Sequence, residues 1–391
     1  MPIPKRVFRE PSSKPRPRLI RWAQAHRRGL RLSFWAFFSV SLGVGYYFLS
    51  QYLSLPMINP LGPINGEPLV ALSDPILREV PHPLTGVYYS QSESESWSGL
   101  RPLGVMIDNH QLARPYQFGL QKADVIYEAV AEGGITRFLA VFHSNAVAKL
   151  GPVRSARVYY MGWALEFPSY YAHVGGATSP VSAADYSTFI SQNGVLSLNQ
   201  FRLGAPTFTF GGNVLLPGGG VLSHINYTST GKLWAAGEKL YPGTNKLPNF
   251  ARWKFKADAP YNARPDSQKV TFNFWSFPAA YQGEWRYNRE TNSYLRFQGG
   301  AQHLDQATKE QLAARNVVLA HMQERSAGDG TARRLYTQLG QGDAEVYRDG
   351  QKILATWKRG SLSARMKFFK RGTSDEIEFN RGLTWIEIIP R

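Results

Sequence analysis

Arg, acidic and His side chains gather in three short stretches of the chain, each beside a glycine or proline turn. The stretches run from Asp108 to Pro115, from Glu132 to Arg137 and from Gly151 to Arg157. An Arg guanidinium can bind a phosphate or carboxylate through two parallel hydrogen bonds. Acids among the Arg residues could hold a metal ion through oxygen or accept a proton. We therefore expect a site for an anionic group in this part of the chain.

The candidates for this site are acid, amide, Arg and His side chains near the ends of expected strands. Taken singly, each has an ordinary structural explanation, because Arg–acid pairs often fasten loops and a buried His usually belongs to the core. Taken together they favour a ligand site, since burying an unpaired charge costs several kcal/mol. The candidates are Asp108, Asn109, His110, Arg114, Asp124, Glu128, Glu132, Arg137, Arg154, Arg157, His173 and His224.

The His residues among the candidates raise the alternative of a zinc or general-base site. No compact metal motif such as H-E-x-x-H accompanies them. The chain also has no Cys, which excludes Cys-ligated zinc, iron–sulfur clusters and thiol catalysis. The sequence therefore assigns no metal and identifies no cofactor. The glycine runs at 211–212 and 218–220 lack the context of a phosphate-binding loop, and we expect them to be ordinary loops.

The net charge of the 391-residue chain is +17, which would normally indicate a polyanionic partner such as nucleic acid. Residues 1–31 carry ten of the Lys and Arg residues and a single acid, Glu10, whereas residues 32–98 carry one base and five acids. About half of the excess therefore belongs to a short basic tail, and only a modest excess is spread over the rest. We expect no nucleic-acid partner.

An uncharged, aromatic-rich run from Leu32 to Leu55 follows this tail directly. A membrane-spanning helix needs about 20 apolar residues, whereas the core of a signal peptide has only about 7–15. The alternative is a buried core helix, but an Arg-rich flank beside an uncharged run is the positive-inside pattern. The sequence predicts a single-pass membrane protein, with residues 1–31 as a cytoplasmic tail, 32–55 as the anchor and the remainder outside.

Residues 56–98 are predicted to be a Pro/Ser-rich tether, because seven prolines favour extended chain. Within it, the polar run Ser90–Ser98 is expected to be flexible. Residues 99–250 are predicted to form an α/β domain, with ligands at the carboxyl ends of its strands. Strands are expected at 102–107, 123–129, 136–143 and 170–174, and helices at 157–167 and 179–191.

Residues 251–391 contain many short alternating runs with glycine turns. Hairpins are expected at 284–297 and 344–357, and Asp349-Gly350 is a strong two-residue turn signal in the second. This part is predicted to be a mainly antiparallel β domain. The expected fold class is therefore α+β: an N-terminal membrane-spanning helix, then an α/β domain and a mainly antiparallel β C-terminal domain.

Several long runs of the chain carry a family resemblance. They are RPLGVMIDNHQLARP (101–115), ADVIYEAVAEGGITRFLAVFHS (123–144), GPVRSAR (151–157), HLDQATKEQLAARNVVLA (303–320) and GLTWIEIIP (382–390). Together they resemble both domains of the DUF3048, or YerB-like, family over residues 99–391. The resemblance implies an envelope-exposed bacterial protein and leaves the biochemical activity unknown. The missing cysteine departs from the lipoprotein anchor of that family, and the predicted spanning helix takes its place.

Two functions of different classes fit these features. The first is an anchored binding protein for peptidoglycan, another envelope polyanion or an envelope partner. The alternative is an enzyme that acts on a phosphorylated or carboxylated envelope glycan. In the enzyme, an Arg group would clamp the anion and an acid would be the metal ligand or base. The Arg group is Arg114, Arg137, Arg154 and Arg157, and the acids are Asp108, Asp124, Glu128 and Glu132.

Overall fold

The computed structural model describes residues 77–247 and 249–391. The predicted tail, the predicted spanning helix at 32–55 and the first part of the tether lie outside the described residues. Among the helices that are described, none is long and apolar enough to cross a bilayer. The described chain begins with a short hairpin, β1 (Val80–Pro81) and β2 (Tyr88–Tyr89), followed by the helix α3 (Gln91–Ser98).

The expectation that residues 90–98 are flexible is wrong, because α3 is a capped helix. The Ser90 hydroxyl accepts a hydrogen bond from the backbone N–H of Glu93 at 3.1 Å. The Glu93 carboxylate in turn accepts from the Ser90 N–H at 2.8 Å. This capping box satisfies two donors that a helix start leaves unpaired. Trp97 then anchors the helix, since its buried ring packs edge-on against His82 with 4.7 Å between ring centroids.

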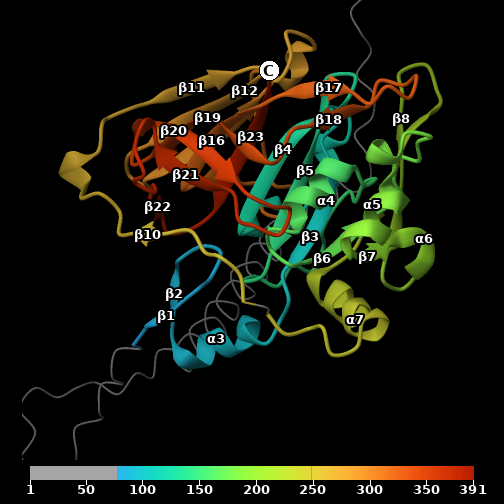
Figure 1. Cartoon of the computed structure of the whole chain (residues 1–391), viewed down its shortest axis with the longest axis horizontal. Helices are drawn as coiled ribbons and strands as arrows, with labels where there is room; N and C mark the ends of the chain where they lie inside the picture. Colours follow the sequence, from blue (N-terminus) through green and yellow to red (C-terminus); the bar gives the residue numbers. More distant parts are fainter. Residues whose placement is uncertain (1–76, 248) are drawn as a thin grey trace, which may run out of the picture. The chain divides into compact units, whose positions relative to one another are not determined.

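The largest sheet has ten strands in the order β21-β20-β19-β16-β23-β4-β5-β3-β6-β7 (Figure 1). Five strands come from the first half of the described chain: β3 (Leu103–Asp108), β4 (Val125–Glu132), β5 (Ile135–Phe142), β6 (Tyr170–His173) and β7 (Leu196–Asn199). The others are β16 (Asn316–Met322), β19 (Gly340–Arg348), β20 (Gln351–Arg359), β21 (Lys367–Lys370) and β23 (Thr384–Pro390). The parallel pair β4 and β23 joins the two groups, so both predicted domain ranges contribute to one sheet.

Different elements bury the two faces of this sheet. The helix α4 (Val158–Ala164) and the small hairpin of β17 (Glu324–Ser326) and β18 (Arg334–Tyr336) pack on one face. The helix α7 (Thr230–Leu240) and a five-stranded antiparallel sheet pack on the other. The strands of that second sheet are β11 (Lys269–Phe272), β12 (Gly283–Asn288), β13 (Ser293–Gln298), β14 (Ala301–Gln302) and β15 (Ala313–Ala314). Because β3, β4 and β5 are buried on both faces, their sequences are nearly continuous apolar runs.

Most of the expected elements are present. Both expected hairpins form, as β12–β13 and β19–β20, and the second turns through Asp349 (φ 52°) and Gly350 (φ 69°). The helix expected at 179–191 is shorter, α5 (Tyr186–Asn193), because Asp185 caps it by accepting from the Thr188 N–H at 2.7 Å. The described chain is thus a sheet-rich α+β fold with mainly antiparallel pairing. Its remaining elements are α6 (Gln200–Leu203), the hairpin β8 (Thr209–Leu215) with β9 (Val221–Tyr227), and the pair β10 (Phe255–Lys256) with β22 (Phe379–Asn380).

Candidate functional site

Three neighbouring parallel strands of the large sheet end at one edge. β3, β6 and β7 pair in parallel, and they end at Asp108, His173 and Asn199. Crevices outside the carboxyl ends of parallel strands are common ligand sites. This edge is therefore where the sequence-predicted residues would have to meet.

The segment 151–157 crosses this edge and is held by three parts of the fold. The Arg154 N–H donates to the Met106 carbonyl of β3 at 2.9 Å. The preceding Val153 N–H donates to Asn226 of β9 at 2.7 Å, and Ala156 donates to Gly175, just after β6, at 3.0 Å. The backbone on both sides of Arg154 is therefore fixed, and its side chain starts from a defined position.

A cavity of about 590 Å³ opens beside this segment, and we call it the Arg154 groove. Its walls come from the 151–157 segment, the turn after β6, the helix α6 and the hairpin β8–β9. The residues that line it are Arg154, Ser155, Val174, Gly175, Gly176, Gln200, Phe201, Phe210, His224 and Asn226. Its volume lies in the range usual for small-ligand pockets.

Arg154 is the cation of this groove. Its Nε lies 3.4 Å from Oδ2 of the buried Asp108, and 27% of the Arg154 side chain is exposed. Asp108 is itself fixed, because its other oxygen accepts from the His110 N–H at 3.0 Å. Arg154 Nε is buried and makes no hydrogen bond, so the ion pair with Asp108 is what orients the guanidinium among the described side chains. The exposed part of the guanidinium faces the groove and is available to an anion.

Glu132, Arg137 and Arg157 form a paired group directly behind the groove. Glu132 lies 3.1 Å from Arg137 and 2.9 Å from Arg157, and Arg137 donates to the Ser155 carbonyl at 3.0 Å. Burial, together with the charges of Arg157 and Arg154, lowers the pKa of Arg137 to about 10. Burial alone would raise the pKa of Glu132, but Arg157 and Arg137 outweigh it and the pKa is lowered. This group supports the groove wall, and its single carboxylate offsets the charge of one of its two Arg residues.

The three candidate His residues have different surroundings. His173 is buried, and its Nδ1 donates to the Gly175 carbonyl at 2.6 Å while Nε2 lies 2.7 Å from the Ser197 hydroxyl. Burial lowers the pKa of His173 to about 4, so it is a neutral support for the groove rim. His224 lines the groove, with Nδ1 2.8 Å from Asn213 Oδ1. Burial lowers the pKa of His110, against an opposing effect of Asp108.

Two further candidates fasten loops away from the groove. The buried Asp124 carboxylate accepts from the backbone N–H groups of His143 and Ser144 at 2.6 and 2.9 Å. Arg114 donates to the Ala280 carbonyl at 2.8 Å and lies 5.0 Å from the centre of the Tyr281 ring. Their contacts are those of structural residues.

Glu128 and Asn109 belong to a buried network that the sequence did not indicate. Arg296 makes ion pairs with Glu128 and with Glu387, and all three side chains are fully buried. The Asn109 amide donates to Glu128 at 3.0 Å. Burial raises the pKa of Glu387 to about 8, which outweighs the opposing charge of Arg296. We call this group the Arg296 network. It cross-links β4, β13 and β23 and faces no cavity that we find among the described residues.

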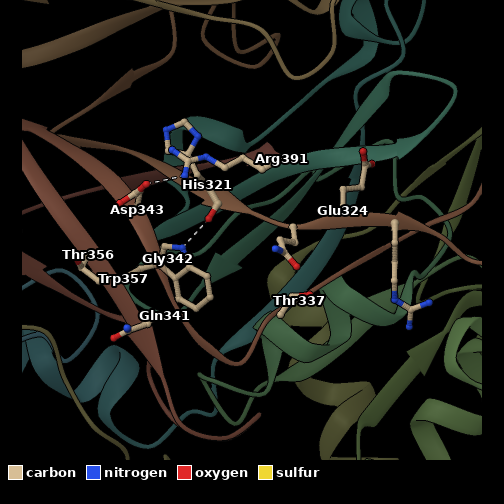
Figure 2. Close-up of a pocket in the computed structure, with 11 residues that line it drawn as sticks. His321, Glu324, Thr337, Gln341, Gly342, Asp343, Thr356, Trp357 and Arg391 are labelled. Carbon is tan, nitrogen blue, oxygen red and sulfur yellow. Dashed lines mark hydrogen bonds and ion pairs between the residues drawn. The ribbon is translucent and has the colours of Figure 1, made fainter.

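A second cavity, of about 690 Å³, lies elsewhere, between β16, β19 and β20, and contains none of the candidates (Figure 2). Of the charged residues that line it, Asp343 pairs with Arg391 at 2.6 Å, Glu324 pairs with Arg334 outside the lining at 3.2 Å, and Arg325 is exposed. The Trp357 indole donates to the His321 carbonyl at 2.8 Å, where the β16–β19 ladder has ended. This cavity therefore lies at a gap between sheet strands and has the exposed Arg325 in its lining, but none of the candidate residues.

The structure therefore places Arg154 and His224 in the lining of one groove, with Glu132, Arg137, Arg157 and His173 behind it. Asp108 reaches the groove through its ion pair with Arg154, and His110 is linked to it by donating its N–H to Asp108. The structure separates Asn109, Arg114, Asp124 and Glu128 from that groove. Sequence reasoning missed the aromatic lining residues Phe201 and Phe210, for which an uncharged stretch was the only signal. In the described part of the chain, no three His, Asp or Glu residues are grouped so that they could hold a metal ion.

Comparison with known proteins identifies the family. Residues 84–240 match the family model "Protein of unknown function (DUF3048) N-terminal domain", and residues 270–386 match its C-terminal domain. A Bacillus subtilis (strain 168) protein described as "Putative lipoprotein YerB" is 31% identical over 317 residues, which are 79% of this chain and 86% of that protein. The crystal structure of YerB protein from Bacillus subtilis superposes with a TM-score of 0.65 at 27% identity, covering 80% of this chain and 97% of the other. The chain belongs to the DUF3048 family.

Proposed function

We propose that this chain is a membrane-anchored, extracytoplasmic protein that binds an anionic component of the cell envelope in the Arg154 groove. The observation that carries the proposal is the partly exposed guanidinium of Arg154, which lines the groove and is oriented by an ion pair to the buried Asp108 at 3.4 Å. An Arg oriented in this way is suited to a phosphate or carboxylate. Peptidoglycan, whose peptides end in carboxylates, is the envelope polyanion we favour as the partner.

The contacts of the acids favour binding over catalysis. A general base must reach the proton that it removes, and its carboxylate must be available to do so. Glu132 is engaged by two Arg residues, Asp124 by backbone amides and Glu128 by Arg296. Asp108 orients Arg154. The enzyme alternative would therefore have to break an existing contact before any candidate acid could act.

The proposed location rests on two supports. The uncharged run at 32–55 with its basic flank predicts an anchor with the later residues outside. The Bacillus subtilis relative is named as a lipoprotein, a class that is attached to membranes from outside the cytoplasm. The anchor would differ in kind, because this chain has no Cys to carry a lipid.

The test measures binding of soluble peptidoglycan fragments to the full-length chain in nanodiscs of zwitterionic lipid, by calorimetry. Charge-assisted hydrogen bonds contribute about 1.5–3 kcal/mol, so Arg154→Ala should weaken binding by about 10-fold or more. Arg325→Ala is the matched control, because Arg325 is an exposed Arg on β17 that lines the other cavity. We expect its affinity to equal that of the wild type.

An equal loss of affinity in Arg154→Ala and Arg325→Ala, or no loss of affinity in Arg154→Ala, would show that the fragments do not bind through this groove. Mass spectrometry of the same mixtures detects turnover. If the wild type converts the fragments and Arg154→Ala does not, the protein is an enzyme and the enzyme alternative holds.

A further inference from the structure

Large apolar side chains are exposed around the Arg154 groove. Phe201 on α6 is 76% exposed, and Phe210 on β8 is 60% exposed, and both line the groove itself. Leu215, Leu216 and Val221 at the tip of the β8–β9 hairpin are also exposed. Exposed apolar side chains that gather beside a cavity are typical of a binding site.

The chain around these residues carries no charge. Between Arg202 and Lys232 there is no Asp, Glu, Lys or Arg. The hairpin tip turns through Gly218, Gly219 and Gly220, all of which have positive φ. An exposed hairpin that served only as a connection would be expected to carry polar side chains, since apolar groups gain nothing from facing water. The composition therefore points to an apolar contact for this hairpin.

The two ends of the groove thus differ in polarity. At one end the partly exposed guanidinium of Arg154 is available to an anion, and Asn226 and His224 also line that part of the groove. At the other end Phe201 and Phe210 continue into the uncharged hairpin. A fully polar anion would leave these rings exposed, and an uncharged apolar partner would leave Arg154 unused.

We infer that the Arg154 groove takes an anionic amphiphile, with the charged headgroup on Arg154 and the apolar chain along Phe201, Phe210 and the tip of the β8–β9 hairpin. This inference rests on the proposed function and names the class of envelope component that the groove would bind. It also assigns a role to the glycine-rich hairpin, whose sequence suggested only a loop.

The test compares two phosphates that differ only in their chain, ethyl phosphate and decyl phosphate, the latter below its critical micelle concentration. Both are titrated into the full-length chain in zwitterionic nanodiscs, and empty nanodiscs correct for partitioning. Each buried methylene adds to affinity, so decyl phosphate should bind at least 10-fold more tightly than ethyl phosphate. Decanol, which has the chain without the charge, should bind at least 10-fold more weakly than decyl phosphate.

Substitutions at the two ends of the groove test the anion contact and the apolar contact separately. The double change Phe201→Ser and Phe210→Ser should weaken the binding of decyl phosphate by about 10-fold and leave the affinity for ethyl phosphate unchanged. Arg154→Ala should weaken the binding of both phosphates. Phe277→Ser with Leu354→Ser is the matched control, since these exposed apolar residues lie outside the groove lining. The control should behave like the wild type.

The failures of the two proposals differ. Equal affinities for ethyl and decyl phosphate, both dependent on Arg154, would overturn the amphiphile and leave the anion site in place. Equal affinities for decanol and decyl phosphate would show apolar binding without headgroup recognition and would also overturn it. If Arg154→Ala changes the affinity for neither phosphate, the proposed anion site itself is wrong.

Discussion

The Arg296 network and the Arg154 groove contain the same residue types in opposite situations. Arg296 is fully buried between Glu128 and Glu387, and its terminal nitrogens are both used in ion pairs. Among the described side chains, Arg154 forms an ion pair with Asp108, and more than a quarter of the Arg154 side chain is exposed beside a cavity. The first arrangement fixes three strands relative to one another, whereas the second leaves binding capacity unused. What distinguishes a structural Arg from a binding Arg here is the number of its nitrogens that are still available.

The largest expected effect is the difference in stability between a variant without Arg296 and a variant without Arg154. Arg296→Met leaves the buried Glu128 carboxylate without its cation and Glu387 without its partner, and breaking a buried ion pair costs about 3–5 kcal/mol. Arg154→Met removes one partly exposed pair, for which about 1 kcal/mol or less is expected. Urea unfolding of both variants gives the two free energies. Similar losses in the two variants would contradict the distinction between the network and the groove.

The pH dependence of stability should come from the network. The folded pKa of Glu387 is about 8, against an ordinary value of 4.5. Between these pH values the folded state holds a proton that the unfolded state has released, so the free energy of unfolding falls as the pH rises, by at most about 1.4 kcal/mol per pH unit. Below pH 6.5, buried His residues with lowered pKa values, such as His173 and His82, give the opposite slope, because the unfolded state binds the protons that they lack. Glu387→Gln should therefore remove the falling slope in urea unfolding between pH 7 and 8. If the slope is unchanged in Glu387→Gln, another group is responsible for the pH dependence. Arg154→Met is the control and should keep the slope of the wild type.

Glu132→Gln tests the paired group behind the groove and should have the smallest effect. It removes the carboxylate shared by Arg137 and Arg157, but 41% of the Glu132 side chain is exposed and water screens the loss. We expect a loss of stability of about 1 kcal/mol and less than a twofold change in the affinity for peptidoglycan fragments. A loss of affinity as large as that of Arg154→Ala would mean that Glu132 belongs to the binding site.

Much of the fold follows from local patterns in the sequence. Asp349-Gly350 predicted its hairpin because that turn needs two residues with positive φ. The helix α3 was missed although Ser90 and Glu93 form a capping box, because a polar run with one Trp has no apolar period. The joining of the two halves by β4 and β23 could not be seen, since parallel pairing of distant strands leaves no local signal.

The candidate site was predictable only in part. Asp108 and Arg154 were named because charged residues at strand ends favour ligand sites, and the structure pairs them. Glu128 carried the same signal, yet its partner Arg296 is 168 residues away and turns it into a structural residue. Phe201 and Phe210 could not be recognised, since an apolar residue in a sequence is expected to be buried and only the fold shows that these are exposed.

The most direct test of the central claim compares the chemical reactivity of the two Arg residues. Phenylglyoxal modifies accessible guanidinium groups, and peptide mass spectrometry of the treated full-length chain reports the modification of each Arg. The account predicts that Arg154 reacts, that peptidoglycan fragments slow its modification in proportion to their binding, and that Arg296 stays unmodified throughout. Modification of Arg154 at the same rate with and without the bound fragments, or a lack of reaction like that of Arg296, would contradict it.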